Sequence, residues 1–396
     1  MLSSLPPVYF YPVSLCYLIC FSIILPFSFC SAPSLFTCPT LCTCYPSPPT
    51  ASCQSHNLSR VPFPLPSSAQ RLFLQNNHIS EIGPGLFSPL TSVLWLFSNH
   101  ISILHPGAFN GLENLEELDL GNNPKFPILQ SDTFEGLKSL RSLHLYHCHI
   151  NRLPSGLFRG LYSLRYLYLQ NNRLTVLPDG LFRDLFNLTQ LFLYGNLLQS
   201  LPAESFFGLS NLDRLLLHSN QLAVVSPGAF RGLKSLTMLY LFNNSLPTLP
   251  GDCLQPLTSL QFLRLNENPW HCDCSCRSLW RWFHSTPGVS SSPVTCNSPP
   301  PLKGRDLRFL VERDLRFCTS NISPRNGNLS DLAFPHKPSS FYIQGDPGAV
   351  LEAGEWENTI EEGGGSGQSA SILTEKQYLY ISFLLVLLSW EVNRYI

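Results

Sequence analysis

Three cysteines alternate in the stretch NPWHCDCSCRSLWRWF, which runs from Asn268 to Phe283. Cysteines this close together can hold a metal ion, carry out redox chemistry or form disulfides that close a fold. A zinc site commonly uses C-x2-C pairs and a redox centre uses C-x-x-C, whereas the spacing here is C-x-C-x-C. We therefore expect no metal site, no redox centre and no cofactor here, and we interpret the stretch as part of a disulfide-bonded cap.

The start of the 396-residue chain predicts entry into the secretory pathway. Residues 1–32 contain no charged side chain, and an apolar stretch from Val13 to Phe29 ends in small residues. This pattern is typical of a signal peptide cleaved between Cys30 and Ala32, with an uncleaved anchor as the alternative. Cysteines outside the cell pair as disulfides, which agrees with a cap and disfavours zinc.

The other end of the chain predicts attachment to a membrane. The apolar stretch from Tyr378 to Trp390 is shorter than the roughly 20 residues that a spanning helix needs. Small residues and a polar spacer precede it, so residues 366–396 are typical of a glycosylphosphatidylinositol (GPI) anchor signal. We predict attachment at Gly365, with Ser369 as the second choice, and a short membrane span is the alternative.

Composition and residue placement argue against two broad classes of function. The formal net charge is -1 and only 13% of the residues are charged, so no nucleic-acid partner is implied. The eleven histidines are scattered along the chain. The positions of the serine, histidine and acidic residues indicate no Ser/His/Asp set and no carboxylate pair. We therefore do not expect an enzyme.

The middle of the chain repeats with a period close to 24 residues. The unit L-x-x-L-x-L-x-x-N-x-L-x-x-L-P-x-x-x-F-x-x-L is typical of a leucine-rich repeat. The asparagine position is occupied by Asn77, Asn99, Asn123, Cys148, Asn172, Asn196, Asn220, Asn244 and Asn268. The phenylalanine position is occupied by Phe87, Phe109, Phe134, Phe158, Phe182, Phe206 and Phe230, and Leu254 closes the series.

These two rows predict how the repeats hold together. No single repeat can bury its leucines, so neighbouring repeats must stack, with parallel strands on a concave face and phenylalanines in the core behind them. Each asparagine is expected to turn inward and bond the loop backbone of adjacent turns, because unpaired buried groups would cost roughly 1–3 kcal/mol each. The fold class is a curved leucine-rich repeat solenoid with disulfide-bonded N- and C-terminal caps.

Six segments follow along the chain. They are a signal peptide (1–32), a Cys-rich N-terminal cap (33–66), leucine-rich repeats (67–268), a Cys-rich C-terminal cap (269–318), a disordered stalk (319–365) and an anchor propeptide (366–396). In the C-terminal cap we expect Trp270 to cover the last turn and a short amphipathic helix at 278–283 to lie over the end of the core.

The cysteine count leaves some thiols without an assigned partner. Cys272 and Cys274 are each expected to bridge to Cys296 or Cys318. Three further cysteines lie outside the cap pairs, namely Cys148, Cys253 and Cys276. We predict a buried free thiol at Cys148. Cys253 and Cys276 could form a disulfide or remain two free thiols, and the sequence leaves both alternatives open.

The chain resembles the Nogo receptor (reticulon-4 receptor) family from about Cys38 to Cys318. The resemblance rests on the cap text CPTLCTCY, on repeat texts such as YLYLQNN and LDRLLLHSN, and on LRLNENPWHCDC. It implies a GPI-anchored neuronal receptor in the outer leaflet of the plasma membrane of projections and cell bodies, with lipid rafts as an expected location. It also implies ligands among myelin-derived inhibitors of axon growth or sialylated and sulfated glycans, and signalling through transmembrane co-receptors.

The same resemblance implies a disulfide pattern. The pairs are Cys38–Cys44, Cys42–Cys53, Cys272–Cys296 and Cys274–Cys318. Cys253 and Cys276 replace residues that are not cysteine in the family. A single-pass or secreted leucine-rich repeat adhesion protein is the alternative to the receptor.

Strand residues outside the leucine pattern are expected to line the concave face. The aromatic ones are Phe73, Trp95, Phe97, Tyr146, Tyr166, Tyr168, Phe192, Tyr194, Tyr240, Phe242 and Phe262. His144, Arg214, His218 and Arg264 accompany them. Exposed aromatic side chains beside arginine suit protein or sugar recognition, whereas the alternative is that strands simply favour aromatic residues.

Two further surface features are predicted. The C-terminal cap is basic and is a second candidate for anionic glycans, or else a solvated face; its basic residues are Arg277, Arg281, Lys303, Arg305, Arg308, Arg313 and Arg316. Five sequons predict N-glycosylation at Asn57, Asn187, Asn243, Asn321 and Asn328.

Overall fold

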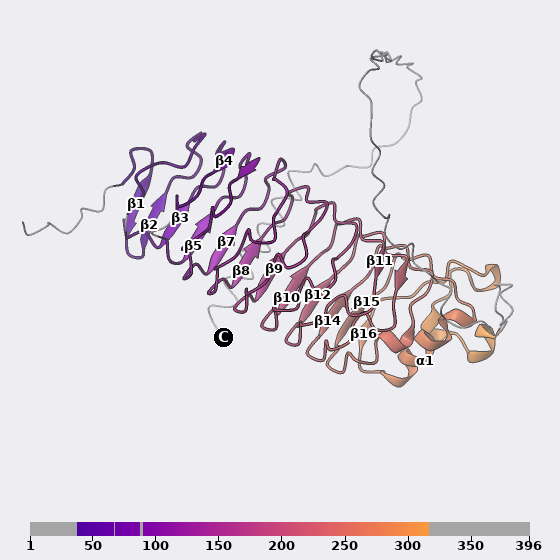
Figure 1. The fold of residues 1–396 in the computed structure, drawn as a ribbon. Helices are drawn as coiled ribbons and strands as arrows, with labels where there is room; N and C mark the ends of the chain where they lie inside the picture. The colour runs from indigo at the N-terminus through magenta and orange to yellow at the C-terminus, as the bar shows by residue number, and fades with distance from the viewer. Residues whose placement is uncertain (1–37, 67, 88–89, 317–396) are drawn as a thin grey trace, which may run out of the picture. The chain divides into compact units, whose positions relative to one another are not determined.

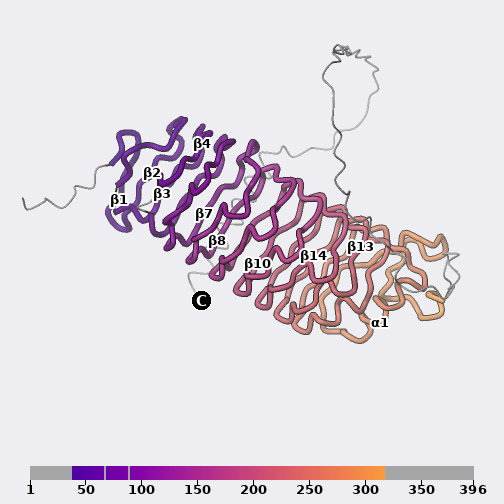
Figure 2. The backbone as a smooth tube through the Cα atoms, viewed as in Figure 1, coloured from indigo at the N-terminus to yellow at the C-terminus, as the bar shows by residue number. Residues whose placement is uncertain are grey.

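The computed structural model describes residues 38–66, 68–87 and 90–316, which form a stack of coils closed by a cap at each end (Figure 1). Figure 2 follows the backbone through the coils from the N-terminal cap to the C-terminal cap. Several predictions lie outside the described residues, namely the signal peptide, the stalk, the anchor signal, Cys318, Asn321, Asn328, Gly365 and Ser369.

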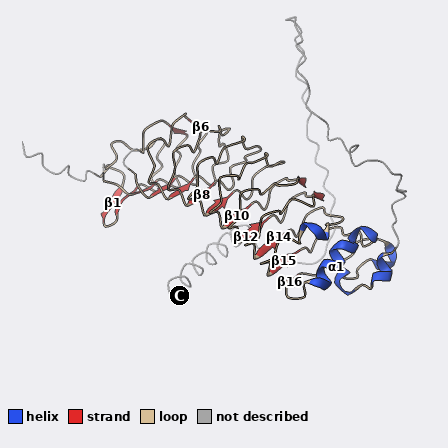
Figure 3. Ribbon diagram, turned by 60° about the horizontal axis from the view of Figure 1, so that its bottom comes forward, coloured by secondary structure: helices blue, strands red, loops and turns tan. Residues whose placement is uncertain are grey.

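A single twelve-stranded sheet lines one side of the stack (Figure 3). Its strands, in order, are β1 (Thr43–Pro46), β2 (Pro49–Ser52), β3 (Arg71–Phe73), β5 (Val93–Trp95), β7 (Glu117–Asp119), β8 (Ser142–His144), β9 (Tyr166–Tyr168), β10 (Gln190–Phe192), β12 (Arg214–Leu216), β14 (Met238–Tyr240), β15 (Phe262–Arg264) and β16 (Ser290–Ser291). Only the β1–β2 pair is antiparallel among these described strands. Equivalent residues pair directly, as Leu167 does with Leu191, so the sequence period sets the register.

The remaining elements are short and lie away from this sheet or in the caps. Two small parallel pairs join β4 (Glu81–Ile82) to β6 (Ile103–Leu104) and β11 (Ser200–Leu201) to β13 (Val224–Val225). The helix α1 (Arg277–Ser285) lies in the C-terminal cap. Five 3-10 helices cover Gly251–Cys253, Cys274–Cys276, Pro300–Leu302, Leu307–Phe309 and Glu312–Leu315.

The core confirms the leucine and phenylalanine rows. The paired leucines of each strand, such as Leu191 and Leu193, have no exposed surface. The seven phenylalanines are all buried, and the stacked neighbours among them have ring centroids 6.0 to 6.5 Å apart. The rings stack in two runs, Phe87 to Phe134 and Phe158 to Phe230, so this core links the repeats within each run.

The inward-turned asparagines form the predicted ladder of hydrogen bonds. The Oδ1 atom of Asn196 accepts from the Leu174 backbone N–H at 3.1 Å. Its Nδ2 donates to the Leu169 carbonyl of the preceding repeat and to the Leu193 carbonyl of its own repeat, both at 3.0 Å. The same pattern occurs at Asn99, Asn123, Asn172, Asn220, Asn244 and Asn268.

Cys148 takes the asparagine position in one repeat. Its Sγ donates to the Leu120 carbonyl of the preceding repeat at 3.2 Å. Burial raises the pKa of this thiol to about 12, so it stays protonated at neutral pH. The prediction of a buried free thiol is confirmed.

Three of the four disulfides that the resemblance implied are present in the described caps. Cys38–Cys44 and Cys42–Cys53 hold the β1–β2 hairpin, and Cys272–Cys296 holds the C-terminal cap. Cys274 is also disulfide-bonded, and its predicted partner, Cys318, lies outside the described residues.

The open question about Cys253 and Cys276 is answered against a disulfide. Both are free, buried thiols. The Sγ of Cys276 donates to the His271 carbonyl at 3.1 Å and lies 3.8 Å from the Thr248 Oγ1, so it is turned to polar groups of its own surroundings. Each thiol packs as a small apolar side chain.

The C-terminal cap closes the stack as the opening cysteine stretch predicted. Trp270 is fully buried, and its Nε1 donates to the Leu265 carbonyl at 2.9 Å. The expected helix is present but longer than predicted, and it buries Leu279 and Trp282. Trp270 therefore covers the last turn with its apolar ring while satisfying a backbone carbonyl there.

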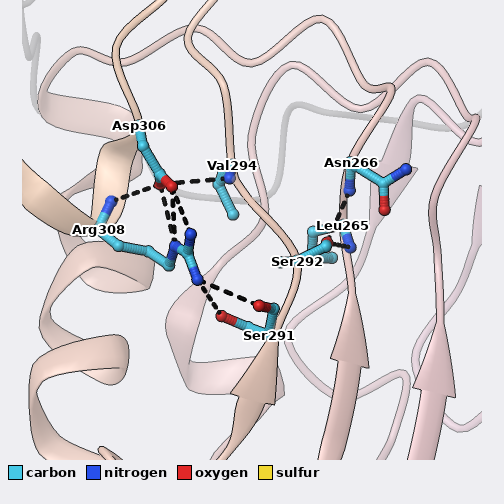
Figure 4. A network of polar contacts seen from close by, with 7 residues as sticks. All are labelled: Leu265, Asn266, Ser291, Ser292, Val294, Asp306 and Arg308. Atoms are coloured by element: carbon cyan, nitrogen blue, oxygen red, sulfur yellow. Dashed lines mark hydrogen bonds and ion pairs between the residues drawn. The ribbon is translucent and has the colours of Figure 1, made fainter.

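Serines and an Arg–Asp pair satisfy the backbone groups at the end of the sheet (Figure 4). Ser292 Oγ accepts from the backbone N–H of Leu265 at 2.8 Å and of Asn266 at 3.1 Å. Arg308 is paired with Asp306 and donates to the Ser291 carbonyl at 3.1 Å. These bonds occupy backbone groups that another repeat would otherwise have paired.

Leu193 offers a direct test of the stacked core. Leu193→Ala is expected to lower the free energy of unfolding by about 2–5 kcal/mol, because the Leu193 side chain is fully buried and its truncation leaves a cavity in the core. Urea denaturation of the purified protein measures this change. Leu197→Ala is the matched control, because Leu197 is 37% exposed; equal effects of the two substitutions would contradict this placement.

Candidate ligand-binding face

The ten aromatic residues predicted to bind a ligand all lie on the side of the sheet that faces away from the core. Six belong to strands, namely Phe73, Trp95, Tyr166, Tyr168, Phe192 and Tyr240. Four lie two residues after a strand, namely Phe97, Tyr146, Tyr194 and Phe242. We call this surface the aromatic face. Its ten side chains are half-buried rather than freely exposed, because they pack on one another.

The strand spacing arranges these rings in stacks. Neighbouring strands lie about 4.8 Å apart, which is also a favourable distance between stacked rings. Tyr168 lies between His144 and Phe192, with ring centroids 4.2 and 4.8 Å away. Phe73 and Trp95 stack at 4.4 Å.

A second three-ring stack follows toward the C-terminal end. His218 lies between Tyr194 and Phe242, with ring centroids 4.5 and 4.4 Å away. Burial lowers the pKa of His218 to about 4, so the imidazole is neutral at physiological pH. Its Nδ1 is buried and has no hydrogen-bond partner among the described residues. The histidine therefore serves in this stack as a neutral flat ring.

A glycine makes room for one ring in the middle of the aromatic face. A Cβ atom added to Gly121 would lie 2.3 Å from the ring of Tyr146. No side chain larger than glycine fits at this position without moving the tyrosine. Tyr146 therefore leans over the backbone of the preceding repeat, and its ring is fixed from below.

A buried carboxylate lies beside Gly121. The Oδ1 atom of Asp119 accepts from the Gly121 backbone N–H at 2.8 Å, and its Oδ2 lies 3.8 Å from His144 Nδ1. Burial raises the pKa of Asp119 to about 7, and burial lowers the pKa of His144 to about 4. The pair is thus kept largely without charge in mildly acidic solution.

The sequence pattern did not identify this central arrangement. Glu117 accepts a hydrogen bond from Trp95 Nε1 at 2.8 Å, which orients the indole on the aromatic face. Glu117, Asp119 and Gly121 are not aromatic, so a search for aromatic residues passed over them. Their outward positions in the 24-residue register were the available signal.

The neighbouring histidines do not form a metal site. His147 Nε2 lies 3.0 Å from Asn171 Nδ2, while His149 Nδ1 lies 3.0 Å from the Pro124 carbonyl. No group of three or more His, Cys, Asp or Glu side chains within residues 38–66, 68–87 and 90–316 could hold a metal ion.

The basic residues of the C-terminal cap are partly engaged within the cap. Arg281 pairs with Glu312 at 3.2 Å, and Arg305 pairs with Asp314 at 3.6 Å. Arg277 donates to the Leu315 carbonyl at 3.1 Å, and Arg308 joins the network of Figure 4. Lys303, Arg313 and Arg316 are exposed. The cap thus offers less unpaired positive charge than the count of basic residues predicts.

Three of the five predicted glycosylation sequons lie on described residues, and their asparagines are exposed at Asn57, Asn187 and Asn243. Asn243 directly follows Phe242 of the aromatic face, and its Nδ2 donates to Ser219 Oγ at 3.1 Å. A glycan at Asn243 would therefore border that face.

Comparisons with known proteins agree with this architecture. The leucine rich repeat family matches residues 67–124, 92–150, 128–174, 138–198, 162–222 and 210–269. Reticulon-4 receptor-like 2 of Rattus norvegicus is 61% identical over 74% of this chain and 69% of its own length. Reticulon-4 receptor-like 2 of Homo sapiens is 62% identical over 75% of this chain and 70% of its own length.

The chain belongs to the reticulon-4 receptor (Nogo receptor) family. Reticulon-4 receptor-like 1 of Rattus norvegicus is 50% identical over 72% of this chain and 64% of its own length. The crystal structure of human trophoblast glycoprotein superimposes with a TM-score of 0.54 at 28% identity, covering 72% of this chain and all of that one.

Family membership makes the chain a cell-surface receptor of the leucine-rich repeat type and not an enzyme. Within residues 38–66, 68–87 and 90–316, no helix has the length and apolar character to cross a membrane. The aromatic face is accordingly a candidate for recognition and not for catalysis.

The raised pKa of Asp119 predicts a pH-dependent effect of Asp119→Asn. The unfolded carboxyl titrates near 3.9, whereas the folded one titrates at about 7. The folded state is therefore penalised increasingly from pH 4 to pH 7, by up to about 1.4 kcal/mol per pH unit. Asparagine avoids this penalty and keeps an oxygen for the Gly121 N–H.

Urea denaturation at pH 5 and pH 8 measures this effect. Asp119→Asn is expected to stabilise the protein more at pH 8 than at pH 5. Asp132→Asn is a control, because that aspartate is exposed on another part of the solenoid. If Asp119→Asn changed the free energy of unfolding equally at both pH values, the pKa of the Asp119 carboxyl would not be raised in the folded protein.

Proposed function

We propose that this chain is a GPI-anchored receptor of the neuronal cell surface that binds its ligand on the aromatic face. The ligands are myelin-associated or other extracellular proteins and glycoproteins, including those with sialylated or sulfated glycans. Binding regulates axon growth, regeneration or synapse formation through transmembrane co-receptors. Support comes from the 61–62% identity to reticulon-4 receptor-like 2 proteins and from the residues that form the aromatic face.

The observation that carries the proposal is the pair of three-ring stacks on the aromatic face. The middle ring of each stack is held on both sides and the outer rings are held on one side, so less side-chain entropy is lost when a partner covers them than free side chains would lose. Rigid, half-buried aromatic rings are the side chains that most often dominate the free energy of protein recognition. The tyrosine hydroxyl groups add polar contacts at the same surface.

Charged residues on the same side of the sheet as the aromatic rings add specificity. Arg214 and Arg264 lie at outward positions of β12 and β15, and Glu117 lies at the equivalent side of β7. A ligand that spans several repeats would meet charges of both signs between the aromatic rings. Such an arrangement fixes the register of a protein partner more than it adds to affinity.

The aromatic face is tested with the double variant Tyr168→Ala/Tyr194→Ala, which removes one ring from each three-ring stack. Its affinity for purified myelin membrane vesicles is expected to fall about thirtyfold or more, because truncation of even one aromatic anchor typically costs about 2 kcal/mol or more. Tyr45→Ala is the matched control, because Tyr45 is 52% exposed on β1, away from both stacks.

Surface plasmon resonance on captured vesicles gives the affinity, and thermal denaturation shows whether each variant is folded. Wild-type affinity in a folded Tyr168→Ala/Tyr194→Ala protein would exclude the stacks as the binding site. An equal loss in the Tyr45→Ala protein would move the site toward the N-terminal cap.

The proposed anchor has a test of its own. Phosphatidylinositol-specific phospholipase C is expected to release the N-terminally tagged protein from intact cells, because the enzyme cleaves the lipid of a GPI anchor. Gly365→Pro, compared with Ser369→Pro, is expected to locate the attachment residue by loss of surface protein. Retention of the wild-type protein after the enzyme would instead favour a membrane-spanning adhesion protein.

A further inference from the structure

An exposed pair of aromatic rings lies on the solenoid outside the aromatic face. Tyr162 is 51% exposed and Phe186 is 44% exposed, and their rings stack with centroids 5.8 Å apart. Both occupy the same place in consecutive repeats, directly after the leucine that follows the phenylalanine core. We call the two rings the Tyr162–Phe186 pair.

Aromatic residues at this place in the repeat are an exception. The equivalent residues in the other described repeats are exposed and polar, namely Thr91, Glu113, Lys138, Ser210, Lys234 and Thr258. Packing within the solenoid therefore does not require an aromatic ring at this place. Neighbouring large apolar side chains left in solvent usually mark a surface that something covers.

A glycan acceptor lies directly beside the pair. Asn187 follows Phe186 in the chain and begins the sequon Asn187-Leu188-Thr189. The Asn187 side chain is exposed, and its Nδ2 donates to the Tyr162 carbonyl at 2.8 Å. This bond points the amide of Asn187 toward the residue that supplies the other ring.

The hydrogen bond leaves the amide able to carry a sugar. A side-chain amide has two N–H bonds, and only one is used by the Tyr162 carbonyl. Glycosylation replaces one hydrogen and leaves the other, so the linkage and the hydrogen bond are compatible. The first sugar then starts beside Tyr162 and Phe186 on the same side of the repeat.

We propose that an N-linked glycan on Asn187 packs its first N-acetylglucosamine residues on the Tyr162–Phe186 pair. The C–H bonds of a pyranose ring carry partial positive charge and favour the negative face of an aromatic ring. The glycan covers the apolar surface in the folded state, and in return the pair holds the sugars against the repeat. This role concerns the stability and solubility of the solenoid and is independent of the aromatic face.

The adjacent repeat shows why this occupant is favoured over a protein partner. Asn211 occupies the place equivalent to Asn187 and makes the same kind of bond, from Nδ2 to the Phe186 carbonyl at 2.8 Å. It is followed by Leu212 and Asp213, so it has no sequon, and the residue before it is Ser210. The sequon therefore coincides with the aromatic pair, and a glycan there would obstruct any protein that docked on the two rings.

Hydroxyl-radical footprinting of the full-length protein from mammalian cells tests the proposal. Peptide mapping first establishes whether Asn187 carries a glycan. In the glycosylated protein, oxidation of Tyr162 and Phe186 is expected to be about threefold slower than in unglycosylated variants, because bulky sugars shield the rings. Phe309 is the internal control, since it is 77% exposed in the C-terminal cap.

Two variants remove the glycan in different ways. Asn187→Gln removes the acceptor but keeps the bond from Thr189 Oγ1 to the Arg165 carbonyl at 2.9 Å. Thr189→Ala removes the sequon but keeps the bond from Asn187 to the Tyr162 carbonyl. Faster oxidation of Tyr162 and Phe186 in both variants supports shielding by the glycan. Faster oxidation in only one variant would assign the change to the lost hydrogen bond and overturn the proposal.

A double-mutant cycle, followed by thermal denaturation, measures whether the sugars and the rings stabilise the protein together. The double variant Tyr162→Ser/Phe186→Ser replaces both rings with serine, the residue found at the equivalent place in the next repeat, Ser210. Asn187→Gln is expected to lower the Tm by about 2 °C in the wild-type background and by less in the double-serine background. Equal losses in both backgrounds, an unglycosylated Asn187 or unshielded rings would each overturn the proposal and leave the pair available to a protein partner.

Discussion

The structure depends on one constraint: a single coil of this chain can neither bury its leucines nor pair its own backbone. The ladder asparagines resolve the polar part of that problem, since Asn196 bonds the backbone of its own repeat and of the preceding one. The phenylalanine row resolves the apolar part behind the sheet. Both rows demand one residue per repeat at a fixed place, so the length of the repeat stays close to 24 residues.

The same constraint prepares the surface that faces away from the core. Strands held in register place equivalent side chains at ring-stacking distance, which is why Tyr168 packs between His144 and Phe192. A flexible loop could present the same residues, but it would have to order them on binding. Here the ordering is completed by folding. The cost is local: the carboxyl of Asp119 is buried among rings, and its pKa rises to about 7.

Much of the fold could be predicted from the sequence, because the features that determine it are periodic. The asparagine and phenylalanine rows located the core, and the outward positions located the ten rings of the aromatic face. Periodicity does not reveal how side chains pair within a face, so the ring stacks of His144 and His218 and the burial of Asp119 were not predicted. The state of Cys253 and Cys276 was open for the same reason, since proximity in the fold does not fix the direction of either thiol.

Recognition on the aromatic face is tested most directly by footprinting the protein with and without bound myelin membrane vesicles. Tyr168, Tyr194 and Phe242 lie in the two three-ring stacks and report on that face. Trp280 of α1 reports on the C-terminal cap. Slower oxidation of the three stack residues with an unchanged rate at Trp280 is the predicted result. Protection confined to Trp280 and the cap, with the stacks unchanged, would contradict recognition by the aromatic face.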